Sequence, residues 1–275
     1  MESATVSVLE LPADATCAYG SRPFRFRHRL ATDAAFSADA VARTCERLPR
    51  GWITIHEADR EIITPVGTLI ETPDSMHDVV HALEDTQHWV VVHHLEHVSP
   101  YRSLLGSVID AVADNVDPAE GELGTRGATA FLASPGAVVP AHIDRHHNFL
   151  LQIRGRKEFT IGTFEDRAAE AREVERNFGP RPSGSHRLPE RQERFDLEPG
   201  DGVYIPPFAF HWARGGAGES VAFSCAFRTE RTDRVELAYE FNAFAARVGL
   251  PRRPPTGSAR DRLKGSVVRL RRRTR

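Results

Sequence analysis

Hydrophobic and polar positions follow one pattern before residue 127 and another after it. In the first part, apolar residues recur at helical spacing in some stretches and alternate with polar residues in others, which predicts a mixed α/β region. The stretches with helical spacing are 37–48, 74–85 and 100–112, and those typical of strands are 22–30, 52–55 and 88–97. Asp74 and Pro100 are suited to begin two of these helices.

Histidines are frequent in this first part, but their spacing does not predict a metal site. On a strand over 88–97, His93 and His97 would share one face about 13 Å apart, with His94 on the other face. We therefore expect a structural or surface role for these three. His77 and His81 are spaced i,i+4 on a predicted helix, but no third ligand is apparent in the sequence, so we expect them to be solvated.

From residue 127 onward, short apolar or alternating runs are separated by glycine and proline turns. The runs are ATAFLAS, PGAVVPAH, NFLLQIRG, KEFTIG, VYIPP and SVAFSCAF. Several short strands at this spacing predict a jelly roll or a related β-barrel. A charged insertion over 164–194, with a helical pattern up to Arg176, interrupts the series, and a long insertion of this kind is usually functional or mobile.

A helix follows the last strand, and a basic segment ends the chain. Asp233 and Glu236 suggest a capping box at the start of this helix. Its apolar stripe would serve a homodimer or be buried within a monomer; the stripe consists of Val235, Ala238, Phe241, Ala245 and Val248.

The expected fold class is mainly β with flanking helices, built on a double-stranded β-helix (jelly-roll) core. The expected divisions are an α/β N-terminal region over 1–126 that packs on the core, the core over 127–230, the C-terminal helix over 231–251 and the basic tail over 252–275.

Composition adds a charge asymmetry to this picture. The 275 residues carry 36 Lys and Arg against 38 Asp and Glu, which is close to balance. Residues 252–275, however, hold ten Lys and Arg and one acid. The tail is interpreted either as a solvated, frayed end that folds back on the acidic body or as a contact for nucleic acid or another acidic partner.

Three further observations exclude whole classes of protein. No apolar run approaches the roughly 20 residues that span a bilayer. The first residues lack the basic and apolar regions of a signal peptide. Cys17, Cys45 and Cys225 are odd in number and far apart, so no disulfide framework or CxxC zinc site is expected. We expect a cytoplasmic protein.

The sharpest candidate site combines two histidines and one aspartate. His142 and Asp144 are separated by two positions, so on a strand their side chains point to the same side. His211 follows 69 residues after His142, beyond a strand and a Pro-Pro turn. Two imidazoles and one carboxylate leave coordination positions open, as non-haem Fe(II) requires, whereas structural zinc prefers a closed tetrahedral set.

Lys157 follows a turn within an otherwise apolar region. A lysine that points into a barrel is costly unless an anion pairs with it. If Lys157 points inward, it needs a partner such as a dicarboxylate; the alternative is that it bends to solvent at the start of its strand.

Three runs carry a resemblance to a known family. HIDRHHNFLLQIRGRK, PGDGVYIPPFAFHW and VAFSCAFRT resemble the JmjC/cupin-like 2-oxoglutarate oxygenases, in particular bacterial cupin-like proteins and the asparaginyl hydroxylase that inhibits hypoxia-inducible factor. The resemblance extends over about residues 127–230. It implies that His142, Asp144 and His211 hold Fe(II), with no catalytic residue beyond these ligands. It also implies that Lys157 binds the distal carboxylate of 2-oxoglutarate and that Asn148 lies near the other end, although Asn148 could instead satisfy backbone groups at a strand edge.

One departure from the family pattern concerns the cosubstrate. Several relatives have a threonine three residues before the first histidine, where this chain has Val139. The missing hydrogen bond to the distal carboxylate must then come from Tyr204 or Ser134, or be absent.

Three residues next to the predicted ligands could line the substrate pocket. His146 and His147 follow the HxD motif and are candidates for the pocket entrance. Trp212 follows the third ligand, where packing behind the site is the alternative role.

The resemblance implies an Fe(II)- and 2-oxoglutarate-dependent dioxygenase that uses O2, releases succinate and hydroxylates an unactivated C–H bond. A peptide or protein side chain is the first choice of substrate. A small molecule, such as a natural-product intermediate, and an RNA base are alternatives with the same chemistry. A non-catalytic, ligand-binding cupin regulator is the alternative from a different class, because jelly-roll proteins include both binders and enzymes.

Overall fold

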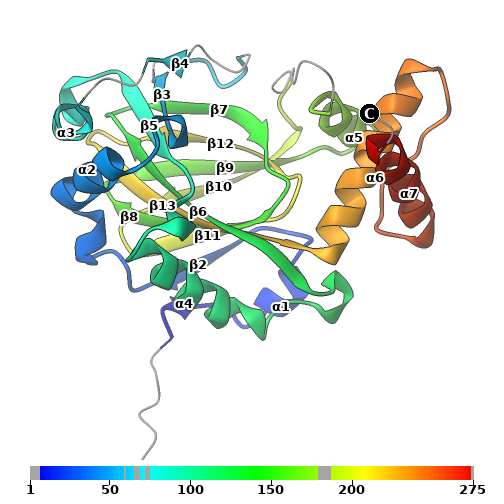
Figure 1. Ribbon diagram of the computed structural model, residues 1–275, viewed down its shortest axis with the longest axis horizontal. Coiled ribbons are helices and arrows are strands. Elements are labelled where there is room, and N and C mark those ends of the chain that lie inside the picture. Colours follow the sequence, from blue (N-terminus) through cyan, green and yellow to red (C-terminus); the bar gives the residue numbers. More distant parts are fainter. Residues whose placement is uncertain (1–6, 59, 65–68, 72–74, 179–186, 274–275) are drawn as a thin grey trace, which may run out of the picture.

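The computed structural model describes residues 7–58, 60–64, 69–71, 75–178 and 187–273. Within these residues, the strands form one sheet of nine strands and a second of four, and every pairing is antiparallel (Figure 1). The larger sheet has the order β1-β2-β11-β8-β13-β6-β5-β3-β4, and the smaller has the order β10-β9-β12-β7.

The bounds of the strands show how the chain alternates between the two sheets. The larger sheet contains β1 (Leu9–Glu10), β2 (Phe24–His28), β3 (Ile53–Glu57), β4 (Leu69–Ile70), β5 (His88–Val92), β6 (Leu123–Ala133), β8 (His147–Arg154), β11 (Asp201–Ile205) and β13 (Ser220–Thr229). The smaller sheet contains β7 (Val138–Ile143), β9 (Lys157–Thr163), β10 (Arg191–Leu197) and β12 (Phe210–Gly215). From β7 onward, the chain crosses between the sheets repeatedly, as in a jelly roll.

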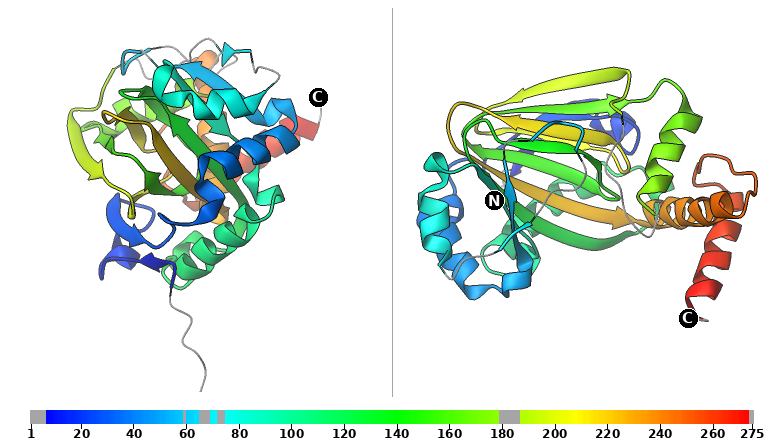
Figure 2. Two further views of the ribbon diagram at one scale, coloured as in Figure 1. Left: turned by 90° about the vertical axis from the view of Figure 1, so that its left-hand side faces the viewer. Right: turned by 90° about the horizontal axis from the view of Figure 1, so that it is seen from above.

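The helices lie on the outside of this β core (Figures 1 and 2). They are α1 (Ala15–Ala18), α2 (Ala38–Arg47), α3 (Met76–His81), α4 (Tyr101–Ala113), α5 (Arg167–Arg176), α6 (Glu230–Arg247) and α7 (Ala259–Arg273). In Figure 1, α2 and α3 lie at one end of the sheets, and α5, α6 and α7 lie at the other. The expected fold class, mainly β with flanking helices, is confirmed.

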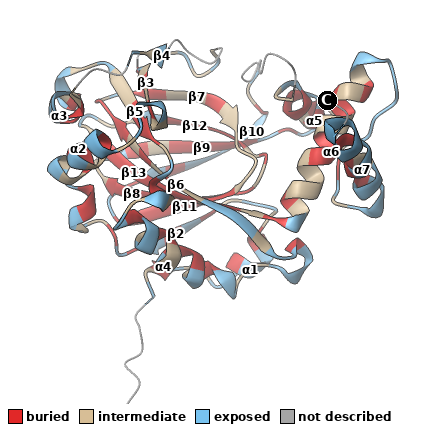
Figure 3. Cartoon of the chain, in the orientation of Figure 1, coloured by how far each residue is buried: buried red, intermediate tan, exposed pale blue. Residues whose placement is uncertain are grey.

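The larger sheet is buried on both faces because its strands alternate between two cores. On β8, Leu150 points between the sheets and packs with Phe159 of β9 and Val203 of β11. Its neighbours Phe149 and Leu151 point the other way, into a core shared with α2 and α4. Figure 3 shows these strands as buried, while the helices are exposed on their outer sides. Burial on both faces explains why NFLLQI is an almost continuous apolar run.

The N-terminal region is more closely joined to the core than a separate packing unit would be. Strands β1 and β2 extend one edge of the larger sheet, and β5, β3 and β4 extend the other. The sheet therefore continues across the boundary expected at residue 126.

Two N-terminal elements are shorter than the pattern predicted. The strand expected over 88–97 ends at Val92; His94 adopts a left-handed conformation (φ 60°), and Leu95–His97 form a 3₁₀ turn, η4. The helix expected over 74–85 is α3, which begins after Ser75, while Asp74 lies outside the described residues.

The capping box expected at Asp233 and Glu236 is wrong. Helix α6 begins earlier, and the reciprocal cap is formed by Thr229 and Thr232. Asp233 and Glu236 instead bind Arg228 at the end of β13. The mistake arose because the helix starts directly at the end of a strand, with no intervening turn.

The basic C-terminus is a helix, not a frayed tail. Helix α7 packs on α6, with Gly265 against Leu237. Of the predicted α6 stripe, Ala238 and Ala245 are buried and Val248 is exposed. Among the described residues, no helix has the length and apolar character that crossing a membrane requires.

Candidate metal centre and active-site cavity

His142, Asp144 and His211 come together at one end of the smaller sheet. His142 lies on β7, Asp144 follows that strand directly, and His211 lies opposite His142 on β12. One ligand atom of each residue lies within 4.8 Å of the others. His211 Nε2 and Asp144 Oδ2 are 3.6 Å apart. The i,i+2 spacing and the antiparallel pairing together produce this cluster.

The histidines are oriented as metal ligands. His142 Nδ1 lies 2.8 Å from the Pro140 carbonyl oxygen, and His211 Nδ1 lies 3.0 Å from that of Ala209. A carbonyl oxygen only accepts, so both Nδ1 atoms donate and each Nε2 keeps a free lone pair. Burial lowers the pKa of His211 to about 4, which keeps it neutral.

The carboxylate completes a donor set that suits Fe(II). Burial raises the pKa of Asp144, but His211, His142 and His146 outweigh that effect and hold it below its usual value. The side chain is 37% exposed, so the cluster is open on one side. Two imidazoles that each present Nε2 and an ionised carboxylate with open positions fit non-haem Fe(II).

The turn that carries Asp144 is fixed from both sides. The Asp144 carbonyl accepts a 2.7 Å hydrogen bond from the backbone N–H of Phe208. The next residue, Arg145, binds Glu236 of α6 at 2.8 Å, and its guanidinium lies over the Phe178 ring. Glu236 in turn binds Arg228 of β13. Helix α6 thus holds the metal-binding turn in place.

Lys157 is a buried cation at the start of β9. It is 5% exposed, and the described residues provide it with no hydrogen-bonding or ion-pair partner. Burial lowers its pKa to about 8. Lys157 lines a cavity of about 70 Å³ together with the three clustered residues. The alternative of a solvent-facing lysine is therefore wrong.

Asn148 and Val139 line the same small cavity. Asn148 is nearly buried, and its Oδ1 accepts a 2.8 Å hydrogen bond from Ser224 Oγ of β13. This bond directs the amide of Asn148 toward the cavity and Asp144. Val139 offers no polar atom at its position.

Sequence reasoning missed Trp89, whose ring also lines this cavity. Its indole Nε1–H is buried and has no hydrogen-bond partner among the described residues, although the ring stacks on His56 at 4.1 Å. The sequence signal was a tryptophan on the same strand face as Val91. Only the packing of the two sheets, however, brings Trp89 of β5 to the same cavity as Val139 and His142 of β7.

A larger cavity of about 470 Å³ adjoins the small one. The two share five lining residues, which makes them continuous: Trp89, Phe131, His142, Asp144 and Asn148. His146 lines the outer cavity, as expected for a residue at the entrance, and burial lowers its pKa. A path therefore leads from the surface past the cluster to Lys157.

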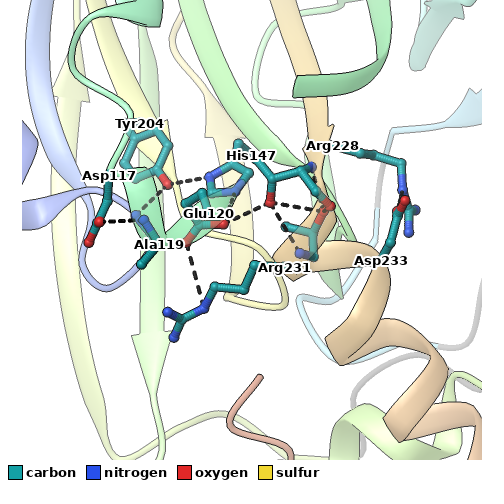
Figure 4. Close-up of polar contacts among 11 residues, drawn as sticks. Asp117, Ala119, Glu120, His147, Tyr204, Arg228, Arg231 and Asp233 are labelled. Carbon is teal, nitrogen blue, oxygen red and sulfur yellow. Dashed lines mark hydrogen bonds and ion pairs between the residues drawn. The ribbon is translucent and has the colours of Figure 1, made fainter. Parts of the chain in front are cut away.

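Tyr204 and His147 lie on the opposite face of the larger sheet, so their predicted roles are wrong. His147 Nε2 donates to Glu120 Oε2 at 3.3 Å, and its Nδ1 accepts from the Tyr204 hydroxyl at 2.8 Å (Figure 4). Alternation along β8 and β11 sends both side chains away from the cavity. Ser134 Oγ is buried, has no partner within the part of the chain that the structure describes, and lies outside the small-cavity lining.

Trp212 is also outside the cavity lining. It is 4% exposed and lies between His211 and Ala213, which both line the small cavity. Its side chain packs behind the site, as in the alternative role, and not in the substrate pocket.

Two histidine clusters correct the sequence analysis. His94 and His97 are not on opposite faces, because the turn after Val92 brings them together around Glu96. His77 and His81 do have a third potential ligand, Asp39 of α2, which lies 3.0 Å from His81. Both clusters join residues through turns or helix contacts that strand alternation does not describe.

Comparisons with known proteins agree with this architecture. Residues 118–235 match the family model of the JmjC domain. Among solved structures, one of Escherichia coli YcfD is 17% identical with a TM-score of 0.53, and the match covers 97% of this chain and 69% of that chain. A structure of YcfD described as a ribosomal oxygenase in complex with cobalt and 2-oxoglutarate is 16% identical (TM-score 0.53; 96% and 67% covered).

A third structure, YcfD with cobalt and succinic acid, is 17% identical with a TM-score of 0.50, and the match covers 96% of this chain and 67% of that chain. At these identities, the likeness shows a shared fold. No curated protein sequence matches this chain.

Proposed function

We propose that this chain, whose residues 118–235 match the JmjC-domain model, is an Fe(II)- and 2-oxoglutarate-dependent oxygenase that hydroxylates an unactivated C–H bond in a protein or peptide side chain. The observation that carries the proposal is the buried, unpaired Lys157 in one cavity with His142, Asp144 and His211. A cation without a partner destabilises an apolar interior unless an anion binds there. A dicarboxylate that also reaches a metal ion satisfies both requirements.

Each residue of the cavity has a defined task in this chemistry. His142, Asp144 and His211 would hold Fe(II), which, when bound, activates O2 with electrons from 2-oxoglutarate and leads to succinate, carbon dioxide and a hydroxylated product. Lys157 neutralises the distal carboxylate and fixes the cosubstrate's orientation. The apolar walls, including Leu150, Phe159 and Ile205, exclude water from the reacting centre.

We propose that Trp89 replaces the hydrogen bond lost through Val139. Its Nε1–H is buried, unpartnered and part of a ring that lines the cavity with Lys157 and Val139. A carboxylate oxygen would satisfy this donor, and a hydrogen bond to a charged group contributes about 1.5–3 kcal/mol. Tyr204 is too far away to take this role, because it lies behind the sheet.

The outer cavity supports a side chain as the substrate. Its volume of about 470 Å³ accommodates a residue that projects from a peptide, and its lining includes polar residues such as Thr54, His93 and Arg126. The neighbour YcfD is described as a ribosomal oxygenase, which agrees with a protein substrate. A small molecule or an RNA base remains the second choice.

Three further predictions from the sequence remain proposals. The cytoplasm is supported by three free cysteines. A nucleic-acid or other acidic partner of α7 is supported by its exposed Arg262, Arg269 and Arg273. The proposal of a homodimer through α6 is supported only by Val248, a residue of the predicted stripe that is exposed.

An anaerobic titration of the purified protein with Fe(II) and 2-oxoglutarate tests the proposal. We expect a visible metal-to-ligand charge-transfer band that is lost in Asp144→Ala and needs at least about 100-fold more cosubstrate in Lys157→Met. His81→Asn, at an exposed cluster elsewhere, is the matched control. Succinate release under O2 then distinguishes an enzyme from a non-catalytic binder. Absence of the band in the wild-type protein contradicts the oxygenase site.

A further inference from the structure

His94, Glu96 and His97 form a second cluster of potential ligands at the edge of the outer cavity. His94 adopts a left-handed backbone conformation (φ 60°, ψ 31°) after the end of β5, so the chain turns, and η4 follows directly. His94 precedes this turn and His97 ends it, and their ring centroids lie 6.3 Å apart. A left-handed backbone is uncommon for a residue other than glycine, and such conformations are often found at functional sites.

Glu96 is held between the two imidazoles. Its Oε2 accepts a 2.9 Å hydrogen bond from the backbone N–H of Ala128 on β6. Its Oε1 lies 3.2 Å from His94 Nδ1 and 3.6 Å from His97 Nε2. The side chain is only 18% exposed. One oxygen therefore fixes the carboxylate to the sheet and leaves the other directed at the histidines.

These distances match the edges of a metal coordination polyhedron. In a tetrahedral zinc site with bonds of about 2.0–2.1 Å, neighbouring ligand atoms lie about 3.3–3.4 Å apart. The two measured separations lie on either side of this value, and all three ligand atoms fall within 4.8 Å of one another. Two imidazole nitrogens and one carboxylate oxygen are donors that Zn²⁺ accepts, with water in the fourth position.

We propose that His94, Glu96 and His97 bind a divalent transition-metal ion, Zn²⁺ by preference, at a site separate from the Fe(II) ligands. The Trp52 ring supports the histidines, with centroid distances of 4.8 Å to His94 and 5.5 Å to His97. His94 and Glu96 also line the outer cavity. The bound ion would fix η4 to β6 through Glu96 and would place a metal with an exchangeable ligand at the entrance used by the substrate.

The proposed Zn²⁺ site does not depend on the oxygenase proposal. Its test uses a protein in which two of the three predicted Fe(II) ligands are replaced, so that metal binding at that cluster does not interfere. The starting protein is the full chain with Asp144→Ala and His211→Ala, titrated with Zn²⁺ by calorimetry and with Co²⁺ by visible absorption. We expect one equivalent of Zn²⁺ bound with a dissociation constant on the order of micromolar. The Co²⁺ spectrum should show the intense bands of a tetrahedral site.

Variants in the same background assign the ion to the cluster. His97→Asn and Glu96→Gln should each weaken Zn²⁺ binding by at least about 100-fold, whereas His81→Asn should leave it unchanged. Glu96→Gln keeps an oxygen for the Ala128 N–H, so loss of affinity in a variant with an unchanged melting temperature reports ligation. Binding that needs millimolar Zn²⁺, that survives His97→Asn and Glu96→Gln, or that is lost in His81→Asn overturns the proposal.

Discussion

The buried polar groups on the two faces of β8 and β11 differ in their hydrogen-bond partners. We call the face that carries His147 and Tyr204 the outer or closed face, and the face that borders the cavity with Lys157 the inner or open face. On the outer face, His147, Tyr204 and Glu120 form a closed chain of hydrogen bonds, completed by Thr229 Oγ1 at 2.7 Å from Glu120. On the inner face, the buried ammonium group of Lys157 on the facing sheet has no partner among the described residues.

This difference separates structural polar groups from functional ones. A buried polar group that is fully paired within the chain is satisfied, so it needs no ligand. A buried cation without a partner lowers stability far more than an unpaired hydroxyl such as that of Tyr19, and in a cavity beside potential metal ligands it indicates an anion that binds there. The sequence contains a histidine next to an asparagine at 147 and 148, and only the pairing pattern shows which of the two faces the cavity.

The largest expected effect comes from the removal of a hydrogen-bonding side chain on the closed face. Glu120→Ala removes the acceptor for the His147 Nε2–H and for the Thr229 hydroxyl, and it leaves these two buried donors without that partner. We expect the free energy of unfolding to fall by about 3–5 kcal/mol. Chemical denaturation measures this loss, while the affinity of the remaining folded protein for 2-oxoglutarate should stay unchanged. If Glu120→Ala instead weakens 2-oxoglutarate binding and does not lower the free energy of unfolding, the polar groups of the outer face are functional, contrary to this comparison.

The opposite result is expected on the open face. Lys157→Met removes a buried cation whose pKa is lowered to about 8, so the cosubstrate-free protein should gain about 2–3 kcal/mol of stability at pH 7. The folded state binds this proton less well than the unfolded state. The cost to the wild-type protein is therefore complete below about pH 8 and disappears as the pH rises toward 10.5.

Denaturation of Lys157→Met and the wild-type protein across this pH range measures the difference. Added 2-oxoglutarate with a divalent metal should stabilise the wild-type protein and have little effect on the variant. Destabilisation by Lys157→Met without ligand would show that the lysine is paired, contrary to the comparison of the two faces.

The sequence was most informative where a motif and a strand period coincide. The i,i+2 spacing of His142 and Asp144 was sufficient to predict their shared side. The apolar surroundings of Lys157 left an inward and a solvent-facing side chain as alternatives, and the structure buries it. The first inference succeeded because strand alternation is local and does not depend on which strands are neighbours.

Other residues could not be placed because their positions depend on long-range pairing or local departures from regular structure. Tyr204 and His147 required the register of β11 with β8, and Trp89 required the order of the larger sheet. The cluster around Glu96 required a left-handed residue at His94, which the alternating pattern before it does not indicate. Contact with α6 stabilises α7, whose charged sequence suggested a frayed end.

A smaller effect is expected from acid on the outer face. His28 continues the buried side of β2, where its Nε2 donates to the Gln152 carbonyl and its Nδ1 accepts from the Leu30 N–H. Burial lowers its pKa to about 4. The neutral form is required in the folded state, so stability is complete above about pH 6.5 and is lost as the pH falls toward 4.

We expect a loss of about 2 kcal/mol between pH 7 and pH 4.5 from His28 alone. His28→Asn keeps an acceptor for the Leu30 N–H and does not titrate in this range. Denaturation at both pH values should show a smaller loss in this variant. If the wild-type protein and His28→Asn lose the same free energy of unfolding between pH 7 and pH 4.5, protonation of His28 does not cause the acid sensitivity.

The smallest expected effect concerns the unpartnered indole of the open face. Trp89→Phe keeps an aromatic ring against His56 and removes the Nε1–H, which has no partner in the described chain. If this donor binds the distal carboxylate, the dissociation constant of 2-oxoglutarate should rise about tenfold, the equivalent of about 1.4 kcal/mol. Stability without ligand should not fall, because no protein hydrogen bond is lost. Trp52→Phe, at the edge of the Glu96 cluster, is the matched control and should leave the affinity unchanged.

The double variant Val139→Thr with Trp89→Phe makes this prediction specific. A threonine hydroxyl at 139 would supply a donor to the same cavity, so it should restore the affinity lost with the indole N–H. Restoration assigns both positions to one carboxylate, since two donors to unrelated groups would not compensate for each other. If Trp89→Phe weakens binding and Val139→Thr does not repair it, the indole binds another part of the cosubstrate. If Trp89→Phe does not change the dissociation constant of 2-oxoglutarate, the indole N–H does not bind the cosubstrate. The missing partner of Lys157 is then the observation that distinguishes the open face from the closed face.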